Sequence, residues 1–332
     1  MQLKIFAVSF LVLLVIIVVL LSGGNEKILG RLSSSPVDVV YTWVDGSDPE
    51  WKMEKQKFES SVKGGTTNKT DSQPKRFGLT KNPSAEIELS LESVQKNIGW
   101  VDKIYIVASR PQTLPDAVLS KYRAKMVYHD EIFPDQAVLP VFSSCAIESC
   151  LHRIPGLKEK FIYFNDDTYI NKPMSYSDFF KSGKPVYRKQ GFTLAQTNDT
   201  STKIYQSAVQ KGIDLFGGRQ KFTPIHQAAA VTKTIMRTAE TKFIKEWTSV
   251  RSARMRSKDE ILPVYVALAL ASDTNQVVST PDHITALFIG EDLKNSHSTK
   301  PRLDEYMICL NDGTDEGIKS LRSKMGLSSE TD

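Results

Sequence analysis

The sequence predicts an α/β fold: a mainly parallel, Rossmann-like sheet with flanking helices and a helical cap, preceded by one N-terminal transmembrane helix. After residue 36, short runs rich in β-branched and aromatic residues alternate with helical segments, which is typical of parallel strands joined by helices. Hydrophobic residues make up 40% of the 332-residue chain, enough for one large core or two modest ones. A third observation, an unbroken apolar run at residues 5–21, predicts the membrane helix.

The apolar run at residues 5–21 is long enough to cross a bilayer and is left out of the folded domain. A cleaved signal peptide is the alternative, but such peptides have a shorter apolar region of about 7–15 residues and an A-x-A-like cleavage site. We therefore expect a short cytoplasmic tail at residues 1–4, a signal anchor at 5–21, a stem at 22–36 and a catalytic domain at 37–332.

Glycosylation triplets and cysteines bear on the cellular compartment of the domain. Asn-X-Thr triplets at Asn68 and Asn198 are candidate glycosylation sites and fit a lumenal catalytic domain. The expected location is the Golgi or another membrane of the secretory pathway, in a single-pass type II orientation, although a bacterial host would change this compartment. The cysteines Cys145, Cys150 and Cys309 have no zinc-type spacing, so we expect buried free thiols, with one disulfide as the alternative.

The catalytic domain is predicted to open with a strand at residues 37–44, where VDVVYTWV is β-branched and aromatic. A mobile loop is expected at residues 60–73, because this polar segment has no apolar periodicity. The alternation that follows consists, in chain order, of a helix at 86–97, a strand at 103–109, a proline-bounded segment at 114–122, a strand at 125–129, a helix at 144–152 and a strand at 160–164.

The last part of the chain is predicted to be mainly helical. Helices are expected at residues 232–247 and 262–271, within a helical cap at 222–272. A final segment, YMICLNDG at residues 306–313, follows the cap.

Acidic or amide side chains follow three of these apolar segments directly. They are Asp45 and Asp48, then Asn165, Asp166 and Asp167, and then Asp312. In an open α/β sheet the ligand crevice lies at the carboxyl ends of the strands, where carboxylates can hold a divalent metal against a pyrophosphate. Each group also has a turn as its alternative, an Asx-type turn for the first and a hairpin turn for the last.

A pyrophosphate substrate also needs positive groups and hydrogen-bond donors. The candidates are Ser143, Ser144, His152, Arg153, Arg256 and Asp259. A serine N-cap is the alternative for the two serines, and a surface i,i+3 pair is the alternative for Arg256 with Asp259. His129 and His226 can each be a surface or core histidine.

The charge pattern argues against nucleic acid as a partner. The net charge of +5 is spread over 43 basic and 38 acidic residues, without long basic runs. The mild positive balance is compatible with an anionic substrate such as a nucleotide sugar.

Four blocks of the sequence resemble the Stealth family, which includes bacterial capsule sugar-phosphate transferases and the α/β subunit of the lysosomal-enzyme GlcNAc-1-phosphotransferase. The first two are long: VDVVYTWVDGSDPEW at residues 37–51, and residues 86–167 with LPVFSSCAIESCLHRIPGL and FIYFNDD. The third, FTPIHQ with residues 256–259, and the fourth, MICLNDG, are shorter.

The resemblance implies that an acceptor-sugar hydroxyl attacks the phosphorus attached to the sugar of a UDP-sugar. A sugar-1-phosphate, with GlcNAc-1-phosphate as one candidate, is then transferred to a glycan or glycoprotein and UMP leaves. It implies Mg²⁺ or Mn²⁺ as cofactor, attachment to the membrane and, as one option, a homodimer.

The resemblance also implies roles for the residues named above. Catalytic roles fall on Asp45, Asp48, Asp166, Asp167 and His226; metal binding falls on Asp166, Asp167 and Asp312; and substrate binding falls on Ser143, Ser144, His152, Arg153, Asn165, Arg256 and Asp259.

Three positions depart from the family pattern. Glu88 and Glu92 stand where the family usually has arginine, and Phe222 stands two residues before a proline where the family has histidine. We expect His226, two residues after that proline, to replace the missing histidine. Two alternative functions stay open: a UDP-sugar glycosyltransferase that releases UDP, and a non-catalytic descendant that binds glycans or partners.

Overall fold

A five-stranded sheet with the order β3-β2-β1-β4-β9 forms the centre of the computed structural model. Its strands are β1 (Val37–Thr42), β2 (Ile104–Ala108), β3 (Ala124–Tyr128), β4 (Lys160–Asn165) and β9 (Ala229–Thr232). The first four strands are parallel, and β9 runs antiparallel to β4. The predicted mainly parallel α/β sheet is therefore confirmed, and its β-branched and aromatic strands are buried as a sheet covered on both faces requires.

The structure describes only part of the chain. The described residues are 36–62, 84–191, 200–219, 222–223, 226–281, 285–289, 305–311 and 314–327. The predicted anchor at 5–21, most of the stem, Asn68, Asn198 and Asp312 lie outside them. The chain divides into Met1–Pro36 and a compact unit at Val37–Asp332, and the elements below belong to the second. No helix within the described ranges is both long and apolar enough to cross a membrane.

The strand order reverses at β1. The chain runs from β1 to β2 and β3 on one side, and then returns to place β4 on the other side of β1. Thr42 at the end of β1 therefore lies beside Asn165 at the end of β4. Ligands of open α/β sheets bind outside the carboxyl ends of the strands at such a reversal, so the loops after β1 and β4 are the natural place for a site.

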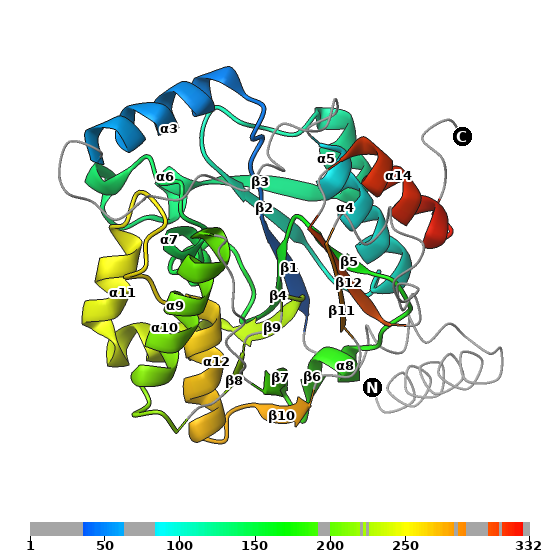
Figure 1. Cartoon of the computed structure of the whole chain (residues 1–332). Helices are drawn as coiled ribbons and strands as arrows, with labels where there is room; N and C mark the ends of the chain where they lie inside the picture. The colour runs from blue at the N-terminus through cyan, green and yellow to red at the C-terminus, as the bar shows by residue number, and fades with distance from the viewer. Residues whose placement is uncertain are drawn as a thin grey trace, which may run out of the picture. The chain divides into compact units, whose positions relative to one another are not determined.

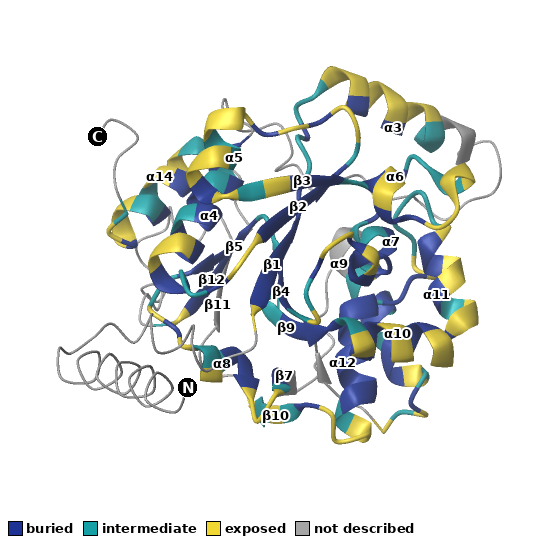
Figure 2. Cartoon of the chain, turned by 180° about the vertical axis from the view of Figure 1, so that it is seen from behind, coloured by how far each residue is buried: buried dark blue, intermediate teal, exposed yellow. Residues whose placement is uncertain are grey.

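Helices cover both faces of the sheet (Figures 1 and 2). One face carries α4 (Ala85–Asn97) and α5 (Asp116–Tyr122), whose apolar side chains pack with Tyr41 and Phe164. The other face carries α7 (Ser144–Glu148), α10 (Lys233–Lys242), α11 (Ile244–Arg251) and α12 (Pro263–Asp273), and their apolar side chains pack with Val40 and Tyr163. The alternation of side chains along each strand thus separates two hydrophobic cores.

A three-stranded sheet adjoins the end of β4. It has the order β11-β12-β5, formed by β5 (Thr168–Ile170), β11 (Thr285–Ile289) and β12 (Met307–Asn311). The pairing of β5 with β12 is antiparallel and sets Cys309 opposite Thr168. Helix α14 (Asp315–Lys324) packs on this sheet and on α4, so the end of the chain is tied to the segment after β4.

The remaining elements are short apart from two helices and one strand. They are α3 (Pro49–Val62), α6 (His129–Ile132), α8 (Tyr176–Phe179), α9 (Thr200–Asp214), β6 (Phe180–Lys181), β7 (Lys184–Gly191), β8 (Phe222–Thr223), β10 (Val278–Pro281) and the 3₁₀ helices η1 (Gln136–Val138) and η2 (Leu151–Arg153). Strands β6, β8 and β10 all pair with β7.

The structure differs from the predicted elements in four places. Helix α3 continues to Val62 and takes in the start of the expected loop at 60–73. The helix expected at 144–152 is broken into α7 and η2, and the helix expected at 232–247 is α10 and α11, separated at Phe243. The expected helical cap at 222–272 also contains β8 and β9. Short apolar runs such as AAVT cannot be assigned to strand or helix by periodicity alone.

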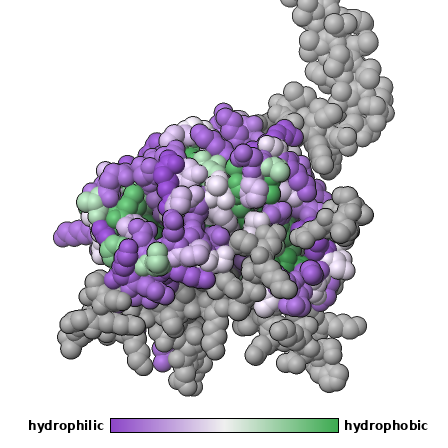
Figure 3. Space-filling view, turned by 90° about the horizontal axis from the view of Figure 1, so that it is seen from above, coloured by the Kyte–Doolittle hydropathy of each residue, from purple (hydrophilic) through white to green (hydrophobic). Residues whose placement is uncertain are grey.

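The described surface is mostly hydrophilic in the view of Figure 3, where the hydrophobic areas are separated by polar side chains. The large apolar side chains that stay exposed among the described residues include Met53, Ile244 and Tyr306, which come from three different parts of the fold. Single exposed apolar side chains of this kind are normal for a globular protein.

Candidate active site

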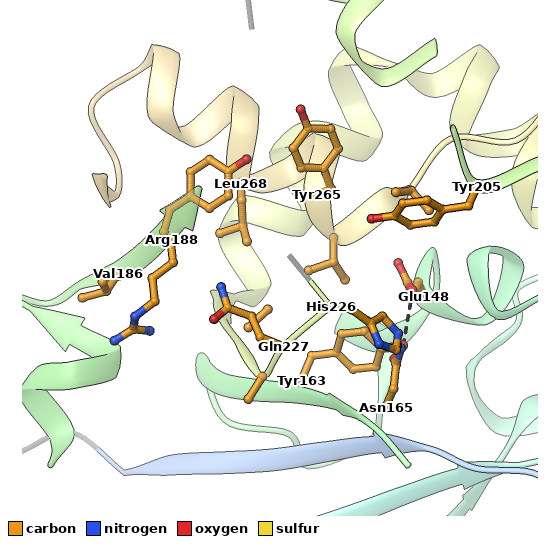
Figure 4. Close-up of a pocket in the computed structure, with 15 residues that line it drawn as sticks. Glu148, Tyr163, Asn165, Val186, Arg188, Tyr205, His226, Gln227, Tyr265 and Leu268 are labelled. Carbon is orange, nitrogen blue, oxygen red and sulfur yellow. Dashed lines mark hydrogen bonds between the residues drawn. The ribbon is translucent and has the colours of Figure 1, made fainter. Parts of the chain in front are cut away.

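A cavity lies at the carboxyl end of β4, on the face of the sheet that α7 and α12 cover. Tyr163 and Asn165 reach it because alternate residues of β4 point to the same face. In Figure 4, Glu148, Tyr163, Asn165 and His226 lie together on one side of the cavity, while Arg188 lies on the other. Convergent polar groups in a largely apolar cavity are the usual mark of a binding site.

His226 is the centre of a polar cluster at this cavity. Its Nδ1 lies 2.8 Å from Cys309 Sγ and 3.8 Å from Asp167 Oδ1, and its Nε2 is hydrogen-bonded to the amide of Asn165. The Asp167 side chain is 1% exposed, whereas that of His226 is 39% exposed. The cluster therefore has one buried carboxylate beneath a histidine that solvent and ligands can reach.

Three separate segments bring this cluster together. Asp167 lies in the turn between β4 and β5, and its carbonyl accepts a hydrogen bond of 3.0 Å from Leu310 N. That bond and the β5–β12 pairing fix Cys309 beside the turn. His226 comes from the segment that leads into β9.

The donor set of the cluster suits some metals better than others. Ligand atoms of Asp167, His226 and Cys309 all lie within 4.8 Å of one another, so one ion could contact all three. Imidazole and thiolate ligands favour ions such as Zn²⁺, whereas Mg²⁺ favours an all-oxygen octahedral shell. The described residues thus fit Zn²⁺ better than the Mg²⁺ or Mn²⁺ expected from Asp166, Asp167 and Asp312. Asp167 belongs to this cluster, whereas Asp312 lies outside the described residues.

The three cysteines are free and buried, as the sequence predicted. Cys309 takes part in the cluster, whereas Cys145 and Cys150 lie in the core formed with α10, α11 and α12. Spacing gave no hint of this, because the partners of Cys309 are far away in the sequence.

Glu148 is a site residue that the sequence did not reveal. It ends α7, lines the cavity, and accepts a hydrogen bond of 3.3 Å from the hydroxyl of Tyr163. The same hydroxyl is 3.0 Å from Thr42 Oγ1 at the end of β1. Burial raises the pKa of Glu148 to about 7. The only sequence signal was an acidic residue among the small and apolar side chains of SCAIESC.

Glu260 is a second buried acid behind the cavity wall. It is 2% exposed and accepts a hydrogen bond of 2.6 Å from Ser143 Oγ. Burial raises the pKa of Glu260 to about 7 as well. Ser143 occupies the N-cap position of α7, as the alternative interpretation held, but its hydroxyl makes no capping bond to the helix.

The predicted phosphate-binding residues divide into three groups. Arg256 donates a hydrogen bond of 2.8 Å to Ser144 Oγ and lies close enough to Glu148 and Glu260 to lower the pKa of both. Asp259 instead contacts Lys211 Nζ at 2.5 Å on the surface, with 81% of its side chain exposed. Among the described residues, Asp259 thus pairs with Lys211, and the expected i,i+3 pair with Arg256 is not formed.

His152 and Arg153 form the third group and do not line the cavity. Both contact the carboxylate of Glu240 on α10, at 2.8 Å each, and Arg251 reaches the same carboxylate at 2.6 Å. Burial works against ionisation, but hydrogen bonds from His152, Arg251 and Arg153 hold the pKa of Glu240 well below its ordinary value. This network joins η2 to α10 and α11, which is a structural role.

Asp45 and Asp48 lie at the carboxyl end of β1 and shape the turn into α3. Asp45 Oδ1 accepts bonds from Ser47 N at 2.8 Å and Ser47 Oγ at 2.6 Å. Asp48 Oδ1 accepts from Glu50 N at 2.8 Å at the start of α3, and its Oδ2 accepts from Gln112 Nε2 at 3.2 Å. The Asx-type turn weighed for this segment is thus present, and neither carboxylate lines the cavity.

Two of the departures from the family pattern, Glu88 and Glu92, do not line the cavity. Glu92 pairs with Arg322 of α14 at 2.6 Å, and Glu88 accepts a hydrogen bond from Ser84. His129 is buried, and burial lowers its pKa to about 4, so it is a neutral core histidine.

Comparison with known proteins matches the two long blocks quoted above. Residues 35–63 match conserved region 1 of the Stealth proteins, and residues 81–187 match conserved region 2. An exopolysaccharide phosphotransferase of Streptomyces coelicolor is 40% identical over 149 residues, which are 44% of this chain and 23% of the relative. Capsular polysaccharide phosphotransferase LcbA of Aeromonas hydrophila is 36% identical over 178 residues, which are 53% of this chain and 48% of the relative. The chain spans about half the length of these relatives or less.

Among solved structures, galactosyltransferase LgtC in complex with donor and acceptor sugar analogues gives a TM-score of 0.47 at 11% sequence identity. The match covers 88% of this chain and 97% of that one. This likeness is too low to bear on the chemistry.

Proposed function

Because the chain carries conserved regions 1 and 2 of the Stealth family, we propose that it is a phosphotransferase that moves a sugar-1-phosphate from a nucleotide sugar to a glycan hydroxyl. Relatives named exopolysaccharide and capsular polysaccharide phosphotransferases support the reaction class. The observation that carries the proposal is the cluster of Asp167 and Cys309 with His226, the member of the cluster that lines the cavity beyond the carboxyl end of β4. This is where an α/β sheet with this strand order binds its ligands.

In the proposed reaction the donor is a UDP-sugar, with UDP-GlcNAc as one candidate, and the leaving group is UMP. The acceptor oxygen forms a bond to the phosphorus attached to the donor sugar, and the bond from that phosphorus to the UMP oxygen breaks. A divalent ion held by Asp167, His226 and Cys309 would stabilise the negative charge of the transferring phosphate. Arg256 lies close enough to Glu148 and Glu260 to lower the pKa of both, and it supplies positive charge there.

The proposal includes the features that rest on sequence alone. The apolar run at 5–21 supports a membrane anchor of the secretory pathway, with the Golgi as the expected membrane, and Asn68 and Asn198 support a lumenal domain. A glycan or glycoprotein is then the acceptor. The two named relatives are bacterial, and in such a host the corresponding membrane is not the Golgi.

The test separates the nucleotide products of the full chain purified in detergent. The protein is incubated with a panel of UDP-sugars, oligosaccharide acceptors and either Mg²⁺, Mn²⁺ or Zn²⁺. We expect metal-dependent UMP, and we expect Asp167→Asn to lower its rate by about 10²–10³-fold, the usual cost of losing one electrostatic contact to a transition state.

The matched control is Asp116→Asn, which removes an exposed carboxylate on α5 and should keep the wild-type rate. UDP in place of UMP would show a glycosyltransferase instead. Neither product, together with no binding of any UDP-sugar, would show a non-catalytic protein.

A further inference from the structure

The proposed reaction needs a group that takes the proton of the attacking hydroxyl. His226 is poorly placed for this, because its two ring nitrogens face Cys309 and Asn165. A histidine that binds a metal through one nitrogen and is hydrogen-bonded through the other has no lone pair left for a substrate proton. The proton acceptor must therefore be another group of the cavity.

Glu148 is the acidic residue that lines this cavity within the described part of the chain. In Figure 4 it lies on the same side of the cavity as Asn165 and His226. The Tyr163 hydroxyl and the backbone N–H of Val264 both donate hydrogen bonds to its carboxylate. These bonds hold the carboxylate at the cavity wall.

The tyrosine-lined part of the cavity suits a sugar, whereas Arg188 lies across the cavity from Glu148 (Figure 4). Tyr187, Tyr205 and Tyr265 contribute aromatic rings with hydroxyl groups, and Leu268 adds an apolar surface. Rings with a polar edge bind ligands that are apolar on one face and hydroxylated at the rim, as sugars are. A carboxylate accepts hydrogen bonds from hydroxyls but repels the pyrophosphate of a donor.

The groups packed around Glu148 set its proton affinity. The pKa of Glu148 is raised to about 7, mainly by burial, and the nearby carboxylate of Glu260 contributes to this rise. The Val264 N–H, the Tyr163 hydroxyl and the positive charge of Arg256 act in the opposite direction. The thiol of Cys145 and the phenol of Tyr205 are also close enough to feel its charge. A pKa near the working pH is what an efficient general base needs.

We propose that Glu148 is the general base of the reaction and that the tyrosine-lined part of the cavity binds the acceptor sugar, an inference that rests on the proposed function. The acceptor hydroxyl gives its proton to a Glu148 oxygen as the acceptor oxygen bonds to phosphorus. The electron pair of the breaking phosphorus–oxygen bond leaves with UMP. Glu260 and Tyr163 act through Glu148 and are positioning residues.

The test is the pH profile of kcat/KM for UMP release by the full chain, with a UDP-sugar and acceptor that the wild type uses. The wild-type rate should rise with pH through about 7, because only ionised Glu148 accepts a proton. Glu148→Gln should lower kcat by about 10²–10⁴-fold and remove this rise. Glu148→Asp keeps the carboxylate, and it should recover part of the rate together with the pH dependence.

Two neighbouring variants should move the profile in opposite directions. Glu260→Gln removes a negative charge that raises the pKa of Glu148, so the rise should shift to lower pH. Tyr163→Phe removes a hydrogen bond that lowers this pKa, so the rise should shift to higher pH. A merely structural role for these residues would lower the rate without shifting the profile.

The outcomes separate this inference from the proposed function. If the wild type releases UMP but Glu148→Gln keeps the wild-type kcat and pH profile, Glu148 is not the base and the inference is overturned. The inference is also overturned if neither neighbouring variant shifts the profile. If the wild type releases no UMP with any UDP-sugar, the proposed function itself is wrong and the inference goes with it.

Discussion

At the scale of single residues, the amide of Asn165 decides which nitrogen of His226 carries the proton. Its Nδ2 faces His226 Nε2, while its own Oδ1 is buried without a hydrogen bond from the described residues. A rotation of the Asn165 amide by half a turn would place its Oδ1 where it accepts a hydrogen bond from His226 Nε2–H. His226 Nδ1 would then carry no proton. That is the form of histidine that binds a metal, and it would satisfy a buried oxygen at the same time.

His129 gives a prediction about stability against pH. Neither ring nitrogen has a hydrogen-bond partner among the described residues, and burial lowers its pKa from 6.5 to about 4. Because the folded pKa is the lower one, the unfolded chain takes up the proton first. The stability present above pH 6.5 is therefore lost as the pH falls from 6.5 to about 4.

Between pH 6.5 and about 4, the free energy of unfolding of His129→Leu should fall by about 3 kcal/mol less than that of the wild type. This difference is the free energy that corresponds to the lowered pKa of His129. Urea unfolding of wild type and variant at about pH 7 and about pH 4 measures it. Equal acid sensitivity of the two proteins would contradict the prediction.

At the scale of elements, the docking of α14 on α4 gives a structural partner to Glu92, one of the two glutamates that depart from the family pattern. Glu92 pairs with Arg322 at 2.6 Å, with 14% and 12% of their side chains exposed, respectively. Lys96 on the same helix donates to the carbonyls of Met325, at 3.2 Å, and Gly326, at 3.0 Å, which end α14. The negative charge of Glu92 on α4 is therefore matched by the positive charge of Arg322 on α14.

A charge-reversal series tests this docking. Arg322→Glu places two carboxylates at a largely buried contact and should lower the free energy of unfolding by about 2 kcal/mol. The double variant Glu92→Arg with Arg322→Glu restores opposite charges and should recover most of the loss. Denaturant unfolding measures both, and a double variant no more stable than Arg322→Glu alone would show that the ion pair does not hold α14.

The helices and strands also show which parts of the fold could be predicted from the sequence and which could not. The strands from β1 to β4 and helix α4 were placed closely, because each is an apolar or amphipathic run bounded by turn residues. Strands β5, β7, β9 and β11 were missed, since their sequences stand out less from their surroundings and the strands gain stability from their neighbours in the sheets.

The site shows the same limit. Asn165, Asp167 and His226 were predicted, the first two because polar residues after a buried strand stand out. Cys309 and Glu148 were not predicted as site residues. Both belong to the site because the fold buries them beside residues that are distant in the sequence, and the sequence does not show this. His152, Arg153 and Asp259 do not line the cavity, and the spacing of charges along a chain does not tell which side of a helix faces a ligand.

At the scale of the whole molecule, the cluster joins three parts of the fold. Asp167 comes from the end of the central sheet, His226 from the segment before β9, and Cys309 from β12. An ion bound by all three would bind the folded state and not the unfolded chain, so it would raise the stability of the whole domain.

We therefore expect Zn²⁺ to raise the midpoint of thermal unfolding of the wild type more than Mg²⁺ does at equal concentration. Cys309→Ser and His226→Asn should remove this difference, and Asn165→Ala should weaken Zn²⁺ binding by about 10–100-fold in calorimetry. Asp116→Asn on the exposed face of α5 is the control and should behave as wild type. A larger shift with Mg²⁺, unchanged in Cys309→Ser, would contradict the transition-metal assignment.

The place of β12 after β4, β5 and His226 in the chain has a consequence for biosynthesis. The ribosome makes β4, β5 and the segment with His226 long before it makes Cys309. A nascent chain can already form most of the central sheet while β5 still lacks its β12 neighbour. The last strand thus completes the cluster, and a chain whose synthesis stops early would carry the two earlier side chains without the thiol that joins them.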